Sequence, residues 1–500
     1  MRELELKFSL PASFSLSSFH PEAAGVTRVE GLPELLLRAT YYDTEDLRLA
    51  RSGVTLRYRS GEGDRSGWTL KLPSDSSQMM DREEMFFPGP SGRVPESVSD
   101  LVTAFARHGE LKPVATLRTK RRRWALVDSG EESLAELSDD EVSIVEGRRV
   151  VARFRELELE ALSIGEDDLK RIGAELRNAG AMSAEPISKA VRALGARATA
   201  HDDIPEPTHL APDSPASTAV RWSLSQGLRR IVKNDPRTRL QDVEGVHQMR
   251  VGARRLRSDL RTFAPLVVPE WANDLSQELK WLAQALGEVR DLDVLEERLQ
   301  TSARDIGVEL QGLWNALEER RLQALDALDQ VLVSDRYRSL LDQAIECARE
   351  PRFTLKAEEE CRVALPPLAA GAWDRFVRRA RVVKPTDPDD VWHAVRIEAK
   401  RARYAAEAVG PFLEKSQHSA AEKFGSLAEQ TQELLGGHQD AVIAAATVEK
   451  YADSPAGSSS RFEAGRLFEM QRQSAREAKQ AFSKQVSVLE KKKNRSWPEN

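Results

Sequence analysis

The sequence predicts an α+β protein of more than one domain, with an antiparallel β domain first and an all-helical domain after it. The chain has 500 residues, more than one hydrophobic core usually serves. Before residue 200, short alternating segments are separated by Gly, Pro, Ser and Asp, whereas from residue 217 onward long runs are rich in Ala, Leu, Arg and Glu. Four prolines between positions 205 and 215 indicate a linker, placed at 201–216.

Composition narrows the classes of protein that the chain can represent. It is 40% hydrophobic and 31% charged, and no apolar run approaches the ~20 residues of a membrane helix. The first residues are too charged for a secretory signal, and two cysteines cannot form a disulfide framework or a Cys-based metal site. We therefore expect a cytoplasmic protein without a membrane partner. Because the net charge is only −6, any anion site must come from local clustering of basic residues.

Alternation in the N-terminal part predicts strands at Glu3–Phe8, Val54–Arg59, Trp68–Leu72, Arg122–Val127 and Phe154–Leu162. Helices are expected near Glu96–His108 and Asp167–Ala179. On the first strand, acidic and basic side chains share one face and apolar side chains share the other. Further polar faces contain Arg57 with Arg59, Lys71, and Glu156 with Glu158 and Glu160, and a separate basic stretch contains Arg118 and Arg121.

For a single strand, such a polar face is usually solvated. Four strands with complementary charges are harder to explain as solvated faces. If the sheet closes into a barrel with these faces inward, its lumen holds carboxylates and cations together. Such a lumen suits a polyanion and a divalent metal. Lys and Arg bind phosphate oxygens, and carboxylates hold Mg²⁺ or Mn²⁺.

The motif Glu3-x-Glu5-x-Lys7 resembles the ExExK signature of CYTH (triphosphate tunnel metalloenzyme) domains. Further matching segments follow in order: Tyr42-Asp43-Thr44, Leu56-Arg57-Tyr58-Arg59, Lys71, Arg118, the three alternate glutamates and Ser188-Lys189. The resemblance covers residues 1–200. It implies an eight-stranded antiparallel β tunnel with flanking helices and metal-dependent hydrolysis of triphosphates.

Residue matching with the family implies specific roles. Triphosphate would be bound by Lys7, Arg57, Arg59, Lys71, Arg118, Arg121 and Lys189. Mg²⁺ or Mn²⁺ would be held by Glu3, Glu5, Glu156, Glu158 and Glu160. Catalytic roles are expected for Glu3, Glu5, Lys7 and Glu158, and Glu83 or Glu84 is a further candidate for the lumen. The glutamate that positions water stays open, as does the choice among triphosphate, polyphosphate, thiamine triphosphate and a nucleotide.

An internal repeat organises the second half of the chain. His247-x-x-Arg250-x-x-x-Arg254-Arg255-x-Arg257 recurs as His393-x-x-Arg396-x-x-x-Lys400-Arg401-x-Arg403. Downstream, Leu286-Gly287-x-x-Arg290-Asp291 is echoed by Leu435-Gly436-x-x-Gln439-Asp440. The repeat predicts two duplicated helical bundles, at about 217–349 and 356–490. Helices are expected at 217–233, 242–264, 270–301, 308–349, 358–383, 389–412, 416–436, 438–453 and 460–490.

Each histidine begins a basic stripe along its helix. His247, Arg250, Arg254, Arg257 and Arg261 fall within a sector of about 80°. Like charges four residues apart destabilise a helix unless an anion lies between them, so the stripes favour anion binding, with a solvated, salt-bridged helix face as the alternative. Nucleic acid is disfavoured as that anion, because the stripes have few aromatic residues for stacking and the chain is acidic overall.

Residues 213–500 resemble the CHAD domain, a conserved-histidine helical domain, through both stripes and the Leu286–Asp291 segment. The resemblance implies two four-helix bundles with a basic groove that binds inorganic polyphosphate. The groove residues carried over are His247, Arg250, Arg254, Arg257, His393, Arg396, Lys400 and Arg403, with Arg255, Lys280, Arg290 and Arg401 as additions. Gln439 replaces the counterpart of Arg290, so weaker binding is expected in the second half.

Two hypotheses follow for the whole chain of CYTH domain 1–200, linker 201–216 and CHAD domain 217–500. The first is a metal-dependent triphosphatase whose helical domain binds inorganic polyphosphate, in the cytoplasm and at polyphosphate granules. The alternative is a polyphosphate-binding protein whose tunnel is weakly catalytic or non-catalytic. The oligomeric state is left open.

Overall fold

The computed structural model describes residues 2–491 apart from 12–13, 17–18, 20, 22, 62, 64–65, 74–79, 185–186 and 206–209, and it also describes Asn494 and Trp497. The Glu3 side chain, to which a catalytic and metal-binding role was assigned, lies outside the described part. The chain divides into two compact units, Met1–Asp203 and Ile204–Asn500. This division falls inside the segment 201–216 that was expected to be a linker.

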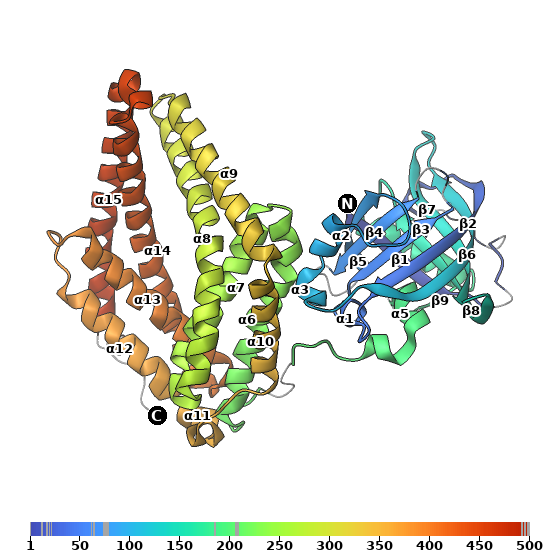
Figure 1. Ribbon diagram of the computed structural model, residues 1–500, viewed down its shortest axis with the longest axis horizontal. Coiled ribbons are helices and arrows are strands. Elements are labelled where there is room, and N and C mark those ends of the chain that lie inside the picture. Colours follow the sequence, from blue (N-terminus) through green and yellow to red (C-terminus); the bar gives the residue numbers. More distant parts are fainter. Residues whose placement is uncertain are drawn as a thin grey trace. The chain divides into compact units, whose positions relative to one another are not determined.

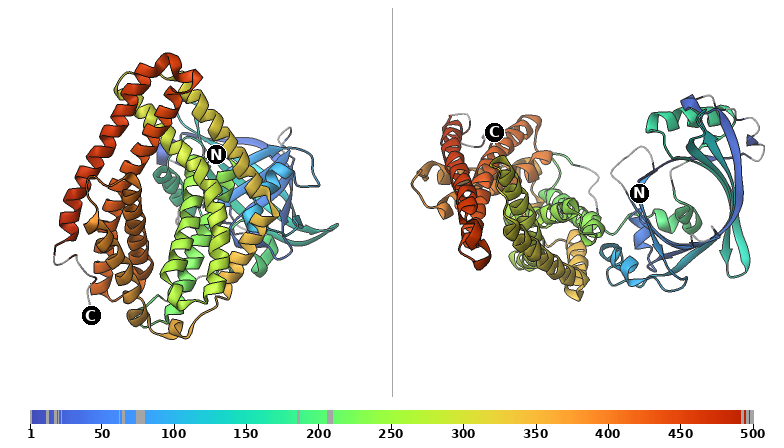
Figure 2. Two further views of the ribbon diagram at one scale, coloured as in Figure 1. Left: turned by 60° about the vertical axis from the view of Figure 1, so that its left-hand side comes forward. Right: turned by 90° about the horizontal axis from the view of Figure 1, so that it is seen from above.

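The first unit is built on an antiparallel sheet. Its strands in the described residues are β1 (Arg2–Ser9), β2 (Arg28–Asp43), β3 (Thr55–Ser60), β4 (Gly67–Pro73), β5 (Met80–Pro88), β6 (Lys112–Val127), β7 (Ser133–Glu146), β8 (Arg149–Ala161) and β9 (Met182–Ser183). The order is β5-β4-β3-β2-β6-β7-β8-β1-β9, and β1 also pairs with β5. The strands therefore curve around a common axis, as the right-hand view of Figure 2 shows.

The strand count exceeds the expected eight by one, because the two-residue β9 pairs with Phe8 and Ser9 of β1. Strands β2, β5 and β7 were not among the segments named from alternation. In β2 the run Leu35-Leu36-Leu37 hides the alternation, and in β7 consecutive acids do the same. The helix expected at Glu96–His108 is two short helices, α2 (Glu96–Asp100) and α3 (Thr103–Ala106).

The core of the first unit lies on the outer face of the sheet. Helix α4 (Glu166–Asn178) covers β1 and β8 there. Its Leu169, Ile172 and Leu176 are fully buried with the apolar residues of the neighbouring strands, Phe8, Leu137, Leu157 and Leu159. Successive residues of a strand face opposite sides of the sheet. Because these apolar side chains are buried on the outer face, the charged residues that alternate with them face inward.

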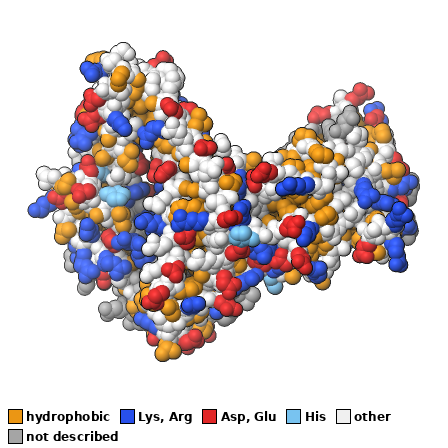
Figure 3. Space-filling view, in the orientation of Figure 1, with side chains coloured by type: hydrophobic (Ala, Val, Ile, Leu, Met, Phe, Trp, Pro, Cys, Tyr) orange, Lys and Arg blue, Asp and Glu red, His pale blue; other side chains and the backbone are white. Residues whose placement is uncertain are grey.

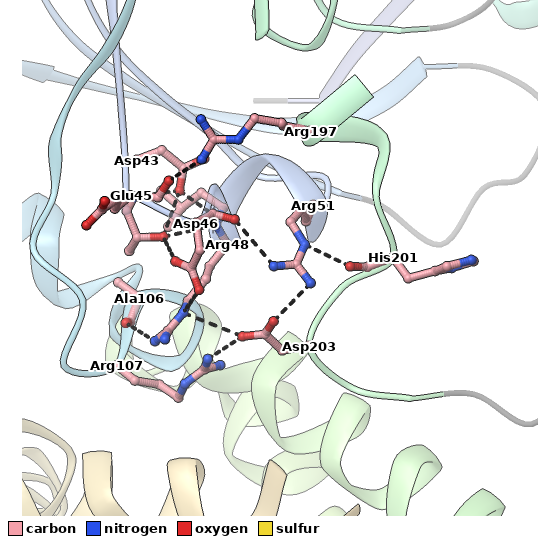
Figure 4. A network of polar contacts seen from close by, with 12 residues as sticks. Asp43, Glu45, Asp46, Arg48, Arg51, Ala106, Arg107, Arg197, His201 and Asp203 are labelled. Atoms are coloured by element: carbon pink, nitrogen blue, oxygen red, sulfur yellow. Dashed lines mark hydrogen bonds and ion pairs between the residues drawn. The ribbon is translucent and has the colours of Figure 1, made fainter. Parts of the chain in front are cut away.

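The end of the first unit is fixed by ion pairs (Figure 4). Arg48 and Arg51, from α1 (Arg48–Arg51), lie 3.5 Å and 3.1 Å from the Asp203 carboxylate, and Arg107 also contacts it. The Arg51 side chain also donates to the His201 carbonyl at 2.7 Å. The folded unit therefore continues past the expected boundary at residue 200.

The second unit is all-helical in the part that the structure describes (Figure 1). Its helices are α6 (Ala216–Arg239), α7 (Val243–Thr262), α8 (Pro269–Asp305), α9 (Gln311–Val333), α10 (Asp335–Arg349), α11 (Cys361–Ala364), α12 (Pro366–Val382), α13 (Asp389–Val409), α14 (Lys415–Ala452) and α15 (Arg461–Leu489). Helices α6 to α9 pack in sequence, and α12 to α15 repeat this order. Helix α10 is an addition to the first repeat and packs on α6 and α8.

Several expected helices have other bounds in the structure. The expected helix 358–383, for example, is the two helices α11 and α12. The expected helix 308–349 is two helices, because Ser334 is extended and its hydroxyl caps α10 by accepting from the Tyr337 amide. Conversely, the segments 416–436 and 438–453 form the single helix α14, which continues through Gly436 and Gly437. Packing holds this long helix in place despite the low helix propensity of glycine.

Among the described residues, no helix is both long enough and apolar enough to cross a membrane.

Candidate functional site

The polar faces of the first unit line one cavity of about 560 Å³. Its basic lining residues are Lys7, Arg57, Arg59, Lys71, Arg121, Arg123 and Lys189. Its acidic lining residues are Glu5, Glu84, Glu136, Asp140, Glu158 and Glu160. These side chains come from β1, β3–β8 and the start of α5 (Lys189–Leu194). The sheet thus brings charges of both signs from distant parts of the sequence into one cavity.

Strand pairing explains the densest part of this cavity. Lys7 lies opposite Glu158, and Asp140 lies opposite both Arg121 and Glu156. Directly opposed residues share a face of the sheet. The Lys7 ammonium lies 3.0 Å from Glu158 Oε1, and Arg121 Nη2 lies 2.7 Å from Asp140 Oδ2 and 2.8 Å from Glu158 Oε2.

Burial and charge together set the protonation of this group. Burial raises the pKa of Glu158, but Lys189, Lys7 and Arg121 outweigh it and hold that pKa well below its usual range. The same balance, with Lys189 and Arg121 as the cations, lowers the pKa of Asp140. Burial acts to lower the pKa of Lys7, yet Glu158 and Glu5 raise it overall. The carboxylates are therefore ionised and the amines protonated at neutral pH.

Carboxylates suited to a divalent metal lie in the same place. Oxygens of Asp140, Glu156 and Glu158 lie within 4.8 Å of one another in the described part of the chain. Three buried carboxyl groups match the preference of Mg²⁺ and Mn²⁺ for hard oxygen ligands. Glu156 lies beneath the cavity lining and is only 1% exposed.

The structure brings together most of the expected tunnel residues. Glu5, Lys7, Arg57, Arg59, Lys71, Arg121, Glu158, Glu160 and Lys189 line the cavity. Arg118 does not join them: it is exposed on the outer face of β6, because it is an odd number of residues from Arg121. Of the two glutamates left open on β5, Glu84 lines the cavity and lies 2.5 Å from Lys71, whereas Glu83 is exposed.

Among the inward residues that sequence reasoning missed are Asp140, Glu136, Arg123 and Tyr41. On β7 the signal was the alternation of Glu136, Ser138 and Asp140 with Ala135 and Leu137. Asp139 and Glu141 obscured it, because they extend the run of acids to the outer face.

Helix α5 holds Lys189 against the cavity. The side chain of Ser188 caps its first turn by accepting from the Val191 amide. Ala190 is buried against an apolar patch of the inner sheet surface that includes Ala39, Leu117 and Val142. The helix backbone is thereby anchored, and the long lysine side chain extends toward the carboxylates.

In the second unit, the two basic stripes meet where α7 packs against α13. Lys400 on α13 is close enough to basic residues of both helices for their charges to act on it: Arg254, Arg396, Arg250 and Arg257. Burial and these neighbours lower the pKa of Lys400 to about 6. We call Arg250, Arg254, Arg257, Arg396 and Lys400 the basic cluster.

Within the described part of the chain, several nitrogen atoms in and beside the basic cluster are buried without a hydrogen-bond partner: the Nε donors of Arg250, Arg257 and Arg396, and Nδ1 of His393, which donates or accepts according to its tautomer. Burying unpaired donors costs free energy, so this arrangement favours an anion as their partner. The visible face of the helical unit in Figure 3 instead shows acidic and basic side chains interspersed. The cluster is thus a local concentration of positive charge.

The second repeated motif positions the stripes. Arg250 Nη2 lies 2.9 Å from Asp291 on α8, and the Asp440 carboxylate on α14 interacts with Arg396. A Cβ atom on Gly287 would lie 3.6 Å from Arg250 Nε, and one on Gly436 would lie 3.7 Å from Arg396 Nε. Each arginine therefore passes directly over the glycine of the neighbouring helix.

Other expected groove residues are paired with acids. Arg255 contacts Asp259 and Glu407, and Arg403 lies 2.7 Å from both Glu407 and Glu429. Arg401 contacts Glu398 on its own helix. Arg255 thereby links α7 to α13 and is less available to an anion. Arg290 lies close enough to His247 to help burial lower its pKa, and Lys280 is exposed on α8.

Comparison with known proteins agrees with this geometry. The CYTH domain model matches residues 1–194, and the CHAD domain model matches residues 223–449. Uncharacterised proteins of two strains of Mycobacterium tuberculosis, CDC 1551 / Oshkosh and ATCC 25618 / H37Rv, are each 32% identical to the chain over 474 residues. The alignments cover 88% of this chain and 87% of each relative.

Solved structures resemble one part of the chain at a time. PptA from Streptomyces chartreusis covers 55% of this chain and 100% of its own, with 24% identity and a TM-score of 0.45. The CHAD domain of the plant Ricinus communis covers 57% and 96%, with 26% identity and a TM-score of 0.46. A Hippeastrum protein described as a putative adenylyl cyclase with dominant triphosphatase activity covers 38% and 94%, with 18% identity and a TM-score of 0.24.

The two domain matches confirm both resemblances expected from the motifs, in the expected order. The chain belongs to the family of proteins in which a CYTH domain is followed by a CHAD domain.

Proposed function

We propose that the CYTH domain is a metal-dependent triphosphatase and that the CHAD domain binds inorganic polyphosphate. The observation that carries the first half is the cavity lined by seven basic and six acidic described residues. A cavity with this lining can neutralise a chain of phosphates and hold a metal beside it. Phosphoryl transfer depends mainly on such positioning and charge stabilisation.

Each group of cavity residues has a proposed task. Lys7, Arg57, Arg59, Lys71, Arg121 and Arg123 bind the phosphate oxygens and orient the triphosphate. Asp140, Glu156 and Glu158 provide the oxygen ligands of Mg²⁺ or Mn²⁺, with Glu5 and Glu160 as further acids in the cavity. A bound divalent metal would stabilise the charge that develops on the leaving phosphates.

The second half of the proposal rests on the basic cluster. Its donors come from both repeats, so one polyphosphate chain can contact α7 and α13 together and gain from multivalency. The buried Nε–H groups of Arg250, Arg257 and Arg396 would each donate a hydrogen bond to a phosphate oxygen.

Phosphate release from the full-length protein tests the catalytic half. Inorganic triphosphate, long polyphosphate, ATP and thiamine triphosphate are compared with Mg²⁺ and with Mn²⁺. We expect metal-dependent release from inorganic triphosphate, and the comparison ranks the other substrates. No release from any of the four would support the binding-only alternative for this chain.

Polyphosphate affinity at two salt concentrations tests the binding half. Replacing Arg250, Arg254, Arg396 and Lys400 with Ala should weaken binding strongly and reduce its salt dependence, because charge pairing is screened by salt. The matched control replaces four dispersed, exposed arginines with Ala: Arg304, Arg320, Arg375 and Arg476. Equal affinities of the two quadruple variants would refute the assignment of the basic cluster.

A further inference from the structure

Lys189 interacts with the acidic group in the way that a metal ion would. Its ammonium nitrogen lies 2.6 Å from Glu156 Oε1, 2.7 Å from Glu158 Oε1 and 2.9 Å from Asp140 Oδ2. These are the three carboxylates whose oxygens lie within 4.8 Å of one another. A single lysine therefore already contacts every ligand that the cluster offers to a divalent cation.

The neighbouring cations contact fewer of these acids. Lys7 contacts Glu158, Arg121 contacts Asp140 and Glu158, and Arg192 Nη1 lies 3.5 Å from Glu156 Oε2. Glu5 also lies 3.7 Å from Lys7. This part of the cavity therefore contains four acidic residues, Glu5, Asp140, Glu156 and Glu158, and four basic residues, Lys7, Arg121, Lys189 and Arg192. A divalent cation added alone would leave an excess of buried positive charge, whereas triphosphate brings the negative charge that balances it.

We propose that Lys189 occupies the metal position until triphosphate oxygens draw its ammonium group away, so that metal and triphosphate bind as a coupled pair. This inference rests on the proposed function of the CYTH cavity. The side chain is suited to the exchange, because it has a flexible four-carbon stem and three rotatable donors. The backbone need not move, since Ala190 anchors α5 on the inner surface of the sheet.

Binding of Mn²⁺ without any phosphate tests the proposal. The full-length protein is titrated with Mn²⁺, and free Mn²⁺ is measured from its electron paramagnetic resonance signal. Lys189→Met removes the ammonium group at similar length and should tighten Mn²⁺ binding by roughly tenfold or more, because a direct competitor and a buried positive charge are both lost. Lys189→Gln provides a second neutral variant, and circular dichroism checks the fold of each.

Lys7→Met is the matched control, because it removes one positive charge from the same cavity but contacts only one of the three carboxylates. It should tighten Mn²⁺ binding less than Lys189→Met does. If both variants tighten Mn²⁺ binding equally, the loss of any positive charge in the cavity explains the effect, and the proposal is overturned. Unchanged or weaker Mn²⁺ binding in both folded Lys189 variants would overturn it as well.

The other half of the exchange is measured in EDTA. Lys189→Met should bind inorganic triphosphate more weakly than the wild type, because the displaced ammonium group is expected to contact phosphate. Retained affinity would contradict this step. Neither measurement involves turnover, so the proposal about Lys189 can fail while triphosphate hydrolysis is observed, and hydrolysis can be absent while Lys189 competes with the metal.

Discussion

At the scale of single residues, Asp140 is central to the CYTH cavity although its sequence neighbourhood conceals it. Its side chain is fully buried, and both Lys189 and Arg121 contact it. Burial raises the pKa of this carboxyl, but the two cations lower it overall. Asp140 is therefore ionised at neutral pH, as its proposed role as a metal ligand requires.

We expect Asp140→Asn to reduce triphosphate hydrolysis by about 10- to 100-fold, because the amide keeps the shape but loses the ligand charge. The measurement is the steady-state rate at several metal concentrations. Glu141→Gln is the control, since Glu141 is exposed on the outer face of the same strand and pairs with Arg122. Equal hydrolysis rates in the two variants would show that Asp140 has no role in the catalytic site.

Lys400 makes a pH-dependent prediction. Burial and the surrounding arginines lower its pKa to about 6, so its amine is largely neutral in the free protein at pH 7.5 and above. Bound phosphates would raise that pKa, and binding would then take up a proton. Polyphosphate affinity should therefore fall as pH rises from about 7.5 to 9, by at most about tenfold per pH unit.

Lys400→Arg is the control for this prediction, because arginine keeps its charge and should remove most of the pH dependence. His247 does not confuse the comparison, since burial and Arg290 lower the pKa of its imidazole, which is neutral in this range. Affinity is measured for both proteins across the range. Parallel pH profiles would exclude Lys400 as the group that takes up the proton.

At the scale of elements, the contact between α4 and β1 sets which face of the sheet is covered. Gly173 makes this contact possible, because a Cβ atom there would lie 2.7 Å from Leu6 Cδ1 and 3.3 Å from Phe8 Cζ. Gly173→Val should destabilise the first unit by about 1–3 kcal/mol through overpacking. The measurement is the midpoint of chemical denaturation.

The same substitution at Gly31 on β2 provides the comparison, since among the described residues, apart from its two chain neighbours, none has an atom within 4 Å of the added Cβ position. Valine is also favourable in strands, so Gly31→Val should leave the midpoint unchanged or raise it. A loss of stability at Gly31 equal to that at Gly173 would show that helix packing is not the cause.

At the scale of the whole molecule, the two units are built from different contacts and should separate. A fragment of residues 1–203 is expected to hydrolyse triphosphate, and a fragment of residues 204–500 is expected to bind polyphosphate without hydrolysing it. Hydrolysis by the helical fragment, measured as phosphate release, would contradict this division of labour.

The cut position should itself affect stability. A fragment ending at residue 200 lacks Asp203 and leaves the buried Arg107 without this ion-pair partner. Breaking a buried pair by removing one partner is strongly destabilising. Thermal denaturation should therefore show a lower midpoint for residues 1–200 than for residues 1–203, and equal midpoints would show that Asp203 contributes nothing.

The sequence by itself was sufficient for the class of each unit and for much of both sites. Alternation in Glu3–Phe8 and in Phe154–Leu162 predicted two strands of the sheet, and the repeated histidine-headed stripes predicted duplicated helices. Periodicity carries this information because burial of one face imposes a period of 2 on strands and 3.6 on helices. Strand alternation and the matching family segments also named most of the charged residues that line the cavity, and the stripes named the residues of the basic cluster.

Only the tertiary structure decided which charged residues act together. Strand register placed Asp140 beside Arg121 and Glu156, and it placed Arg118 outside. Packing of α5 brought Lys189 into contact with three carboxylates. Packing of α7 against α13 paired Arg255 with Glu407 and surrounded Lys400 with arginines. The physical reason is that local periodicity fixes the face on which a side chain lies, whereas its partners and its pKa depend on residues far away in the chain.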